Sequence, residues 1–240
     1  MVFSLWEFAG HSDGSVFVSP FSATVLEAAK FLTQEGFWGA FAKSNEALLV
    51  GVPLALIIGF PIGFALGRVR PFDRAAGFLL DVMLTIPMVA IVPVVIVALG
   101  LTLSARVAVV FFFAVPLAAL YGRAAVRVVD RELIEMAQSF GASRLQVWTR
   151  VILPSSTASL FVGLRLAVAH GISGMIVIEL TLIPAGLGDL LLTYKSQFSS
   201  DQLFAATLLI GLEGFVVLGL IEFVRRRIIR GRRIPEADQS

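Results

Sequence analysis

The chain has 240 residues, of which 58% are hydrophobic and 15% charged, and its mean hydropathy is +0.91. A soluble domain of this length has too little interior to bury so much apolar surface, so the composition excludes an ordinary soluble protein and indicates a membrane protein. Cysteine is absent and histidine occurs twice, which excludes disulfide frameworks and cysteine nucleophiles and leaves too few ligands for a Cys/His metal site.

The N-terminal part of the chain contains one segment with helical periodicity, at residues 20–32, which is too polar to cross a membrane. Residues 1–10 have no basic segment and only a short apolar run, so no cleavable signal peptide is expected. Within residues 20–32, apolar side chains recur at helical spacing, at Phe21, Val25, Ala28, Ala29 and Leu32. This pattern predicts an amphipathic helix that lies along the outer membrane interface.

Long apolar runs predict the membrane-spanning helices, because a hydrocarbon core of ~30 Å needs ~20 apolar helical residues. Candidate runs occur at residues 47–66, 82–105, 107–122, 157–183 and 204–224. The third run is short and is expected to need flanking arginines that snorkel to the interface. The sequence therefore predicts an all-α fold, a polytopic transmembrane helix bundle that forms a single domain over residues 1–240.

Glycines at a spacing of four mark the first predicted span. They are Gly59, Gly63 and Gly67, and such small residues let helix backbones approach closely. Packing inside the chain is the preferred interpretation, and a contact between two copies of the chain is the alternative.

Arginines are concentrated on one side of the predicted spans. They follow the first span, fill the segment after the third, and form a tail at residues 225–240 that holds six arginines between Arg225 and Arg233. By the positive-inside rule this side is cytoplasmic, which places residues 1–46 in the periplasm. The tail is interpreted as an anchor on anionic lipid with Glu222 as its partner, and no nucleic-acid partner is expected.

The segment at residues 123–156 carries the strongest local signals. Asp130 is expected to cap a first helix, Gly141 to end it in a left-handed conformation, and Ser143 with Gln146 to form a capping box for a second helix. Pro154 is expected to stop that second helix. The apolar faces, with Leu133, Met136, Ala137 and Phe140 on the first helix and Leu145, Trp148 and Ile152 on the second, must dock on the protein itself or on a cytoplasmic partner.

These residues resemble the EAA signature of ABC importer permeases, E-A-A-x3-G-x9-I-x-L-P. Five of its seven fixed positions match, at Glu135, Ala137, Gly141, Leu153 and Pro154, while Met136 and Val151 replace an alanine and an isoleucine. The resemblance implies a type I importer permease fold and a coupling loop that sits on a separate ATPase subunit. The residues it places in that contact are Glu135, Met136, Ala137, Phe140, Gly141, Ala142, Ser143, Leu153 and Pro154. The alternative is a hairpin that only covers the ends of the bundle.

More of the chain, residues 17–230, resembles the nitrate, sulfonate, taurine and bicarbonate branch of these permeases. The similarity rests on Ile86-Pro87, on Val92-Pro93 before Gly100, and on Glu179 ahead of Gly186-Leu187-Gly188. Members of the branch have a first span that ends in a Trp-Glu pair. Because Trp6-Glu7 lies close to Met1, that span is expected to be a stub. Either the start codon is assigned too late, or the protein works with about five spans and the interfacial helix.

The resemblance also implies the partners and the location. They are cytoplasmic ATP-binding-cassette subunits that carry ATP and Mg, a second permease copy, an external solute-binding protein and membrane lipid, in the cell inner membrane. The expected cargo is a small oxyanion. No cofactor, metal or catalytic residue is expected on this chain, which lacks HExxH, GxSxG and P-loop motifs.

Ionisable residues inside spans are functional candidates, because each costs ~2.5 to 3.5 kcal/mol to insert. Glu179, with Gly186 and Gly188, is interpreted as a gate or a brace of the translocation path, or as an incidental helix-end carboxylate. An ion pair between Arg165 and Glu213 is a further hypothesis. The remaining alternatives are a membrane-embedded enzyme using Glu179, Glu213 and His170, and a channel or scaffold, although neither explains an amphipathic cytoplasmic hairpin.

Overall fold

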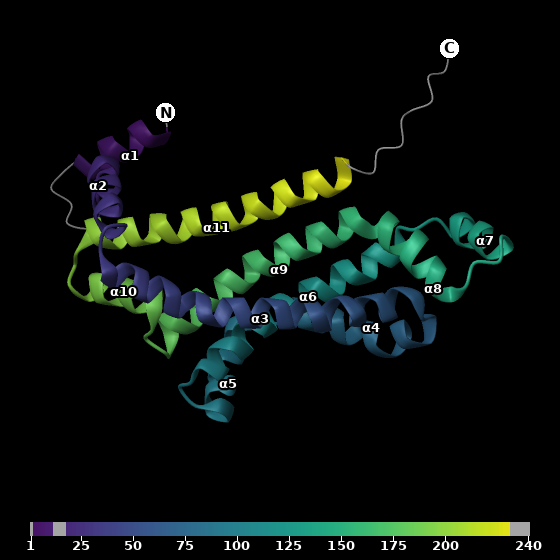
Figure 1. Cartoon of the computed structure of the whole chain (residues 1–240). Helices are drawn as coiled ribbons and strands as arrows, with labels where there is room; N and C mark the ends of the chain where they lie inside the picture. The colour runs from purple at the N-terminus through teal and green to yellow at the C-terminus, as the bar shows by residue number, and fades with distance from the viewer. Residues whose placement is uncertain (1, 12–17, 231–240) are drawn as a thin grey trace, which may run out of the picture. The chain divides into compact units, whose positions relative to one another are not determined.

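The computed structural model describes residues 2–11 and 18–230, and within these ranges every regular element is a helix (Figure 1). In chain order the elements are α1 (Val2–His11), α2 (Phe21–Phe31), α3 (Glu35–Arg68), α4 (Arg70–Thr85), η2 (Met88–Ala90), α5 (Ile91–Leu99), α6 (Leu103–Arg127), α7 (Arg131–Ser139), α8 (Arg144–Val147), η3 (Trp148–Ile152), α9 (Leu153–Thr181), α10 (Gly186–Ser196) and α11 (Ser200–Arg230). The predicted all-α class is confirmed. Of the predicted tail, residues 231–240 lie outside the described residues.

Four helical segments of the described chain are long and apolar enough to cross a membrane: Glu35–Arg68, Leu103–Arg127, Arg144–Thr181 and Ser200–Ile228. A fifth crossing is possible only if the bent pair Arg70–Thr85 and Met88–Leu99 counts as one span. The predicted five spans are matched only if this bent pair counts as one span. The first predicted span, at residues 47–66, lies inside the longer helix α3, and the second, third and fourth also need correction.

The second predicted span, at residues 82–105, is wrong as a straight helix. The chain bends by 91° between α4 and the helical segment that follows it. Ile86 is extended, with φ −67° and ψ 130°, because the ring of Pro87 clashes with a helical conformation at the preceding residue. Pro87 also has no N–H with which to continue the ladder.

The third and fourth predicted spans are longer than expected. α6 has 25 residues and extends beyond Arg106 and Arg123, the arginines that flank the predicted span. At this length the helix crosses the membrane without needing these arginines to snorkel. Pro154 does not stop the helix that begins at α8. It is the second residue of α9 and directly follows the π-helical turn η3, which joins α8 to α9 in one helical segment from Arg144 to Thr181.

The chain forms two compact units, and the four long helices α3, α6, α9 and α11 contribute to both. The described part of the first unit consists of residues 2–11, 18–51, 88–110 and 172–216. The described part of the second unit consists of residues 52–87, 111–171 and 217–230.

The predicted amphipathic helix is confirmed as α2, but its buried face is rotated from the predicted one. Ala28 and Phe31 are buried in the core of the first unit, where the ring of Phe31 stacks on Phe37 at 5.9 Å and on Tyr194 at 5.5 Å. Val25 and Leu32, predicted on that face, are 43% and 47% exposed. The stacking of aromatic rings from α3 and α10 selects the face that contains Phe31.

The N-terminal helix α1 is tied to α2. The indole N–H of Trp6 donates to the carbonyl of Ser19 at 2.9 Å. The Glu7 carboxylate accepts bonds from the Ser22 backbone N–H at 2.8 Å and from the Ser22 hydroxyl at 2.7 Å. These bonds lower the pKa of Glu7, and they supply an acceptor to the otherwise unpaired first turn of α2.

The glycine stripe of α3 packs within the second unit, which confirms the preferred interpretation. A Cβ at Gly59 would lie 2.6 Å from Cβ of Ala118 on α6, and one at Gly67 would lie 2.8 Å from the carbonyl oxygen of Arg123. A Cβ at Gly63 would collide with the backbone of α6 at Ala119. The backbones of α3 and α6 are therefore in direct contact along this stripe.

Replacing Gly63 with leucine is expected to destabilise the protein strongly, because the added side chain meets main-chain atoms that cannot rotate away. Overpacking typically costs 1–3 kcal/mol and more against a rigid backbone, so roughly 3 kcal/mol is expected. The matched control is Gly39→Leu in the same helix, where a Cβ meets nothing within 4 Å. Monodisperse protein that remains after heating in detergent is the measurement, and equal survival of the two variants would contradict the packing.

Candidate functional site

A buried polar cluster in the first unit surrounds Glu179, near the C-terminal end of α9. The side chain of Glu179 is completely buried. The hydroxyl of Ser44 on α3 donates to its carboxylate, at 2.7 and 2.9 Å from the two oxygens. The backbone N–H of Gly188 on α10 donates to the same carboxylate at 3.1 Å. One side chain thus joins α9, α3 and α10.

The two glycines predicted beside Glu179 are required by close approach. Gly186 begins α10 with φ +57°, and a Cβ there would collide with the hydroxyl oxygen of Ser44. A Cβ at Gly188 would collide with Cβ of Glu179. Gly188 lies within a helix and not in a turn, so the predicted Gly-Leu-Gly turn is limited to its first residue. Ser44 completes the arrangement by accepting the N–H of Leu187 at 2.8 Å.

Arg106 of α6 is the cation of this cluster, and sequence reasoning missed it. Its side chain is 6% exposed, and its guanidinium donates to the carbonyl of Lys43 at 2.8 Å. Nη1 lies 3.5 Å from Oε1 of Glu179, and Nη2 lies 3.8 Å from Oε2 of Glu46. In the sequence, Arg106 stands between the second and third predicted spans, at residues 82–105 and 107–122. This position between two apolar runs was the available signal, because it allows the arginine to be buried. A buried guanidinium needs a buried carboxylate as its partner.

The geometry of Glu179 is that of a brace. Its carboxylate is turned toward α3 and α10 and is paired with Arg106, so its charge is balanced inside the first unit. The role of this arrangement in transport stays a prediction.

Other predicted charged groups divide into paired and unpaired ones. Glu222 bonds Arg225 at 2.6 and 2.7 Å and Arg226 at 2.9 Å, which confirms its predicted pairing with the basic tail. The hypothesised ion pair of Arg165 with Glu213 is not among those of the described residues, and Arg165 is exposed. His170 is exposed, with Nδ1 3.2 Å from the carbonyl oxygen of Leu166.

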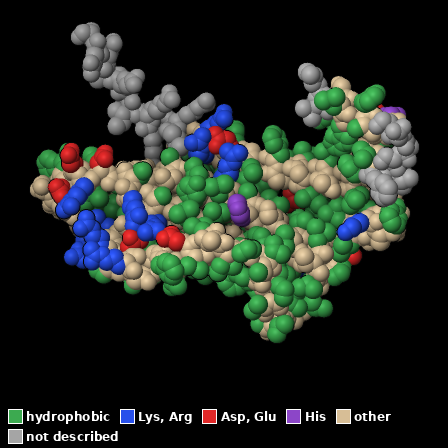
Figure 2. All heavy atoms as spheres, turned by 180° about the vertical axis from the view of Figure 1, so that it is seen from behind, with side chains coloured by type: hydrophobic (Ala, Val, Ile, Leu, Met, Phe, Trp, Pro, Cys, Tyr) green, Lys and Arg blue, Asp and Glu red, His purple; other side chains and the backbone are tan. Residues whose placement is uncertain are grey.

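The second unit contains the predicted cytoplasmic hairpin, formed by α7, the turn at Gly141, and α8. Gly141 has φ +77°, and Ser143 forms the full capping box with Gln146, so both local predictions are confirmed. Asp130 occupies the N-cap position of α7, but its side chain makes no capping hydrogen bond, and that detail of the prediction is wrong. Figure 2 shows charged side chains gathered at the end of the second unit that carries this hairpin.

One face of the hairpin packs on its own unit. Ile134, Val147 and Ile152 are buried with Val126 and Val129 of the α6 end. Trp148, Ala137 and Ala142 pack partly against this cluster. The predicted coupling residues Ala137 and Ala142 therefore support the hairpin from beneath.

The other face of the hairpin is apolar and uncovered. Phe140 is 86% exposed, Leu145 72% and Met136 55%. Glu135 lies on the surface and pairs with Arg131 at 2.7 Å, while Ser143 and Leu153 are exposed as well. Leu145 was predicted on one face with Trp148 and Ile152, but the π-helical turn rotates those two residues inward and leaves Leu145 outside.

Comparisons with known proteins agree with this architecture. A family model described as the inner membrane component of binding-protein-dependent transport systems matches residues 51–230. The match covers more than half of the chain, and the chain belongs to this family of multi-pass membrane proteins.

Relatives and a solved structure extend the comparison. A probable ABC transporter permease of Brucella melitensis is 27% identical over 212 residues, which cover 88% of this chain and 86% of that protein. The taurine transport system permease of Escherichia coli is 26% identical, covering 79% and 69%. The nitrate import permease of Leptolyngbya laminosa is 23% identical, covering 82% and 71%. A chain of the inward-facing MetNI methionine ABC transporter superposes with a TM-score of 0.65 at 20% identity, covering 83% and 95%.

The chain is therefore a membrane-spanning permease subunit of an ABC importer, with the type I importer permease fold. A membrane-embedded enzyme and a channel or scaffold are not favoured.

Proposed function

We propose that the chain forms half of the pathway through which an importer moves a small sulfonate or inorganic oxyanion into the cell. The support is the similarity to permeases named for taurine and nitrate, together with a fold in which the buried Glu179 carboxylate is paired with Arg106. A second copy of the chain completes the pathway, and an external solute-binding protein delivers the anion. The arginine-rich side, which includes the hairpin and the tail at 225–240, is cytoplasmic, and residues 1–46 are periplasmic.

The uncovered face of the hairpin is the observation that carries the coupling part of this proposal. Phe140, Leu145 and Met136 are large apolar side chains on a segment that is too short to enter lipid and that lies among charged residues. Patches of this kind are typical of protein interfaces. A cytoplasmic ATPase subunit, which holds ATP and Mg, is the partner. This chain itself binds no cofactor in the proposed cycle.

The buried cluster of Glu179, Gly186 and Gly188 is proposed to brace a gate of the pathway. It links α3, α9 and α10 through hydrogen bonds. These bonds depend on the left-handed conformation of Gly186 and on the absence of a side chain at Gly186 and Gly188, where a Cβ would collide with Ser44 and Glu179. Packed helices joined in this way move as one body, and such bodies switch between discrete arrangements. α10 therefore follows α3 and α9 in each conformational change.

Reconstitution in proteoliposomes tests the proposed function. The chain is combined with the ATPase subunits and the solute-binding protein encoded with it, and taurine, nitrate and an alkanesulfonate are supplied outside with ATP inside. At least one of these sulfonates or oxyanions is expected to enter only when the binding protein is present, and to raise ATP hydrolysis severalfold. Solutes of matched size that carry neither a sulfonate nor an inorganic oxyanion group serve as controls. Binding-protein-dependent uptake of a control solute and of none of the three test solutes would contradict the substrate class.

A further inference from the structure

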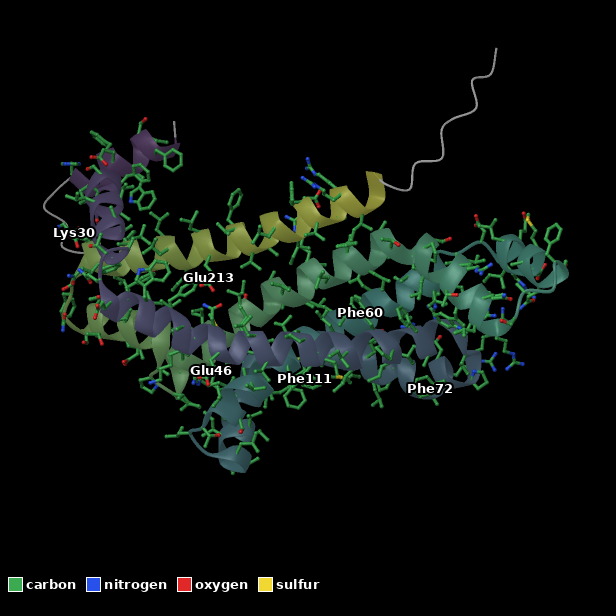
Figure 3. The ribbon with its side chains drawn as sticks, in the orientation of Figure 1. Lys30, Glu46, Phe60, Phe72, Phe111 and Glu213 are labelled. Carbon is green, nitrogen blue, oxygen red and sulfur yellow. The ribbon has the colours of Figure 1, made fainter. Side chains whose placement is uncertain are left out.

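A pocket of about 350 Å³ lies within the second unit, between the end of α3 and the hairpin. Its lining comes from α3, α7, α8 and the turn η3, and consists of Arg68, Gln138, Arg144, Val147 and Trp148. None of these five described residues is acidic. Figure 3 shows nitrogen-bearing side chains gathered at this end of the second unit. The pocket therefore has a positive charge and the size of a small-molecule site.

Aromatic packing positions both arginines of the pocket. Phe60, which Figure 3 labels, stacks on Phe64 at 6.3 Å, and the ring of Phe64 lies 5.8 Å from that of Trp148. Arg68 follows Phe64 by four residues, so the two lie on the same face of α3, one turn apart. The N–H of Trp148 donates to the carbonyl of Arg144, which places these two residues one turn apart as well. The contact of Phe64 with Trp148 thus brings the two arginines to one pocket.

The two arginines of the pocket have no carboxylate partner within the described part of the chain. Arg68 and Arg144 are exposed, and neither forms an ion pair there. Other arginines of the same unit are neutralised, since Arg123 and Arg127 both pair with Asp73, at 2.6 and 2.5 Å. Two guanidinium groups that line the same pocket repel each other, and an anion bound between them replaces this repulsion with attraction.

The donors of the pocket select an anion that has several acceptor oxygens. Each guanidinium presents a planar fork of N–H groups that binds two oxygens at once, and the side-chain amide of Gln138 adds two more N–H donors. A carboxylate has only two oxygens, which a single fork occupies. A sulfate or phosphate group has enough oxygens for both forks, and a chloride ion has no geometry that matches a fork.

We propose that Arg68 and Arg144 form a binding site for a tetrahedral oxyanion, a sulfate or phosphate group, in the pocket between α3 and the hairpin. A dissolved anion and the headgroup of an anionic phospholipid are the two sources of such a group, and they share this chemistry. The bound group ties the end of α3 to α8, because one arginine comes from each helix. The site is separate from the Glu179 cluster of the first unit and does not depend on which solute is transported.

Equilibrium binding of radiolabelled sulfate to the purified full chain, in a maltoside detergent and a chloride buffer, tests the proposal. Wild type is expected to bind sulfate saturably, and phosphate is expected to displace it much better than acetate does. Arg68→Gln and Arg144→Gln are each expected to weaken binding at least about tenfold, because one charged fork is lost. Arg74→Gln is the matched control, since Arg74 is an exposed arginine of the same unit that does not line the pocket.

The control is expected to bind sulfate as wild type does. Absence of saturable binding to wild type would overturn the proposal, and so would equal binding by the Arg68, Arg144 and Arg74 variants. Because the ATPase subunits and the solute-binding protein are absent from this measurement, its result is independent of the proposed transport function.

Thermal unfolding supplies a second measurement and shows whether the variants are folded. Without sulfate, the midpoints of all variants are expected to match that of wild type, because the replaced side chains are exposed. Sulfate is expected to raise the midpoint of wild type and of Arg74→Gln, and to leave those of Arg68→Gln and Arg144→Gln unchanged. Arg68→Lys keeps the charge without the fork, so an intermediate rise is expected. An equal rise in every variant would contradict a site at the two arginines.

Lipid nanodiscs distinguish the two sources of the oxyanion. If the headgroup of an anionic lipid occupies the pocket, phosphatidylglycerol discs are expected to abolish the sulfate binding that phosphatidylcholine discs retain. If a dissolved anion occupies it, binding is expected in both kinds of disc. Either result supports the site only when Arg144→Gln weakens binding in phosphatidylcholine, and undiminished binding by that variant would overturn it.

Discussion

Arg106→Met is expected to reduce the yield of folded protein severely, and adding Glu179→Gln in the same chain is expected to restore most of it. In the wild type, the Arg106 guanidinium lies 3.5 Å from the Glu179 carboxylate. The single change leaves this carboxylate fully buried without its counter-ion. Breaking a buried ion pair from one side costs ~3–5 kcal/mol, whereas replacing both charges with neutral groups is often close to neutral. The long separation of the pair places the expected effect near the lower end of that range.

The measurements are the yield of monodisperse protein and its midpoint of thermal unfolding in detergent. Arg165→Met is the matched control, because Arg165 is an exposed arginine of a membrane-spanning helix. Equal stability of the Arg106→Met and Arg165→Met variants would show that the ion pair of Arg106 with Glu179 contributes nothing to stability. If the double variant is as unstable as Arg106→Met, Arg106 acts through its hydrogen bond to the Lys43 carbonyl. Glu179→Ala, which also removes the acceptor for Ser44 and Gly188, is expected to be less stable than Glu179→Gln.

Phe140→Asp is expected to leave the permease folded and to lower ATP-driven uptake at least about tenfold. A loss of ~1.4 kcal/mol of binding free energy at the interface with the ATPase subunit corresponds to a tenfold loss of affinity. The side chain of Phe140 is 86% exposed, so an aspartate there meets water in the isolated chain. In the proposed complex the same aspartate would be buried against the ATPase subunit without a partner. Copurification of the ATPase subunits and uptake into proteoliposomes are the measurements.

Two comparison variants separate coupling from folding. Phe140→Leu keeps an apolar side chain and is expected to retain most of the uptake. Ile134→Asp, on the opposite and buried face of α7, is expected to lower the yield of the permease itself. Uptake by Phe140→Asp at the wild-type level, with the ATPase still copurifying, would show that this face of the hairpin is not the docking surface.

Signals contained in a few neighbouring residues were predicted correctly. The left-handed Gly141, the capping box of Ser143 with Gln146 and the spacing of Gly59, Gly63 and Gly67 each depend on local backbone geometry, which the residue types restrict directly. Proline gave mixed results because its effect depends on its position in a helix. Pro87 breaks the second span, and Pro154 is accommodated in the first turn of α9.

The membrane class, the family with its EAA-like spacing, and Glu179 as a candidate site residue follow from the sequence alone, because apolar length and motif spacing are properties of the chain. The contacts of Glu179 could not be predicted in this way. Ser44 precedes it by 135 residues on α3, Arg106 comes from α6, and the N–H of Gly188 comes from α10. Which charged groups meet across a bundle depends on the rotation of each helix about its axis, and that rotation is set by packing of the whole unit.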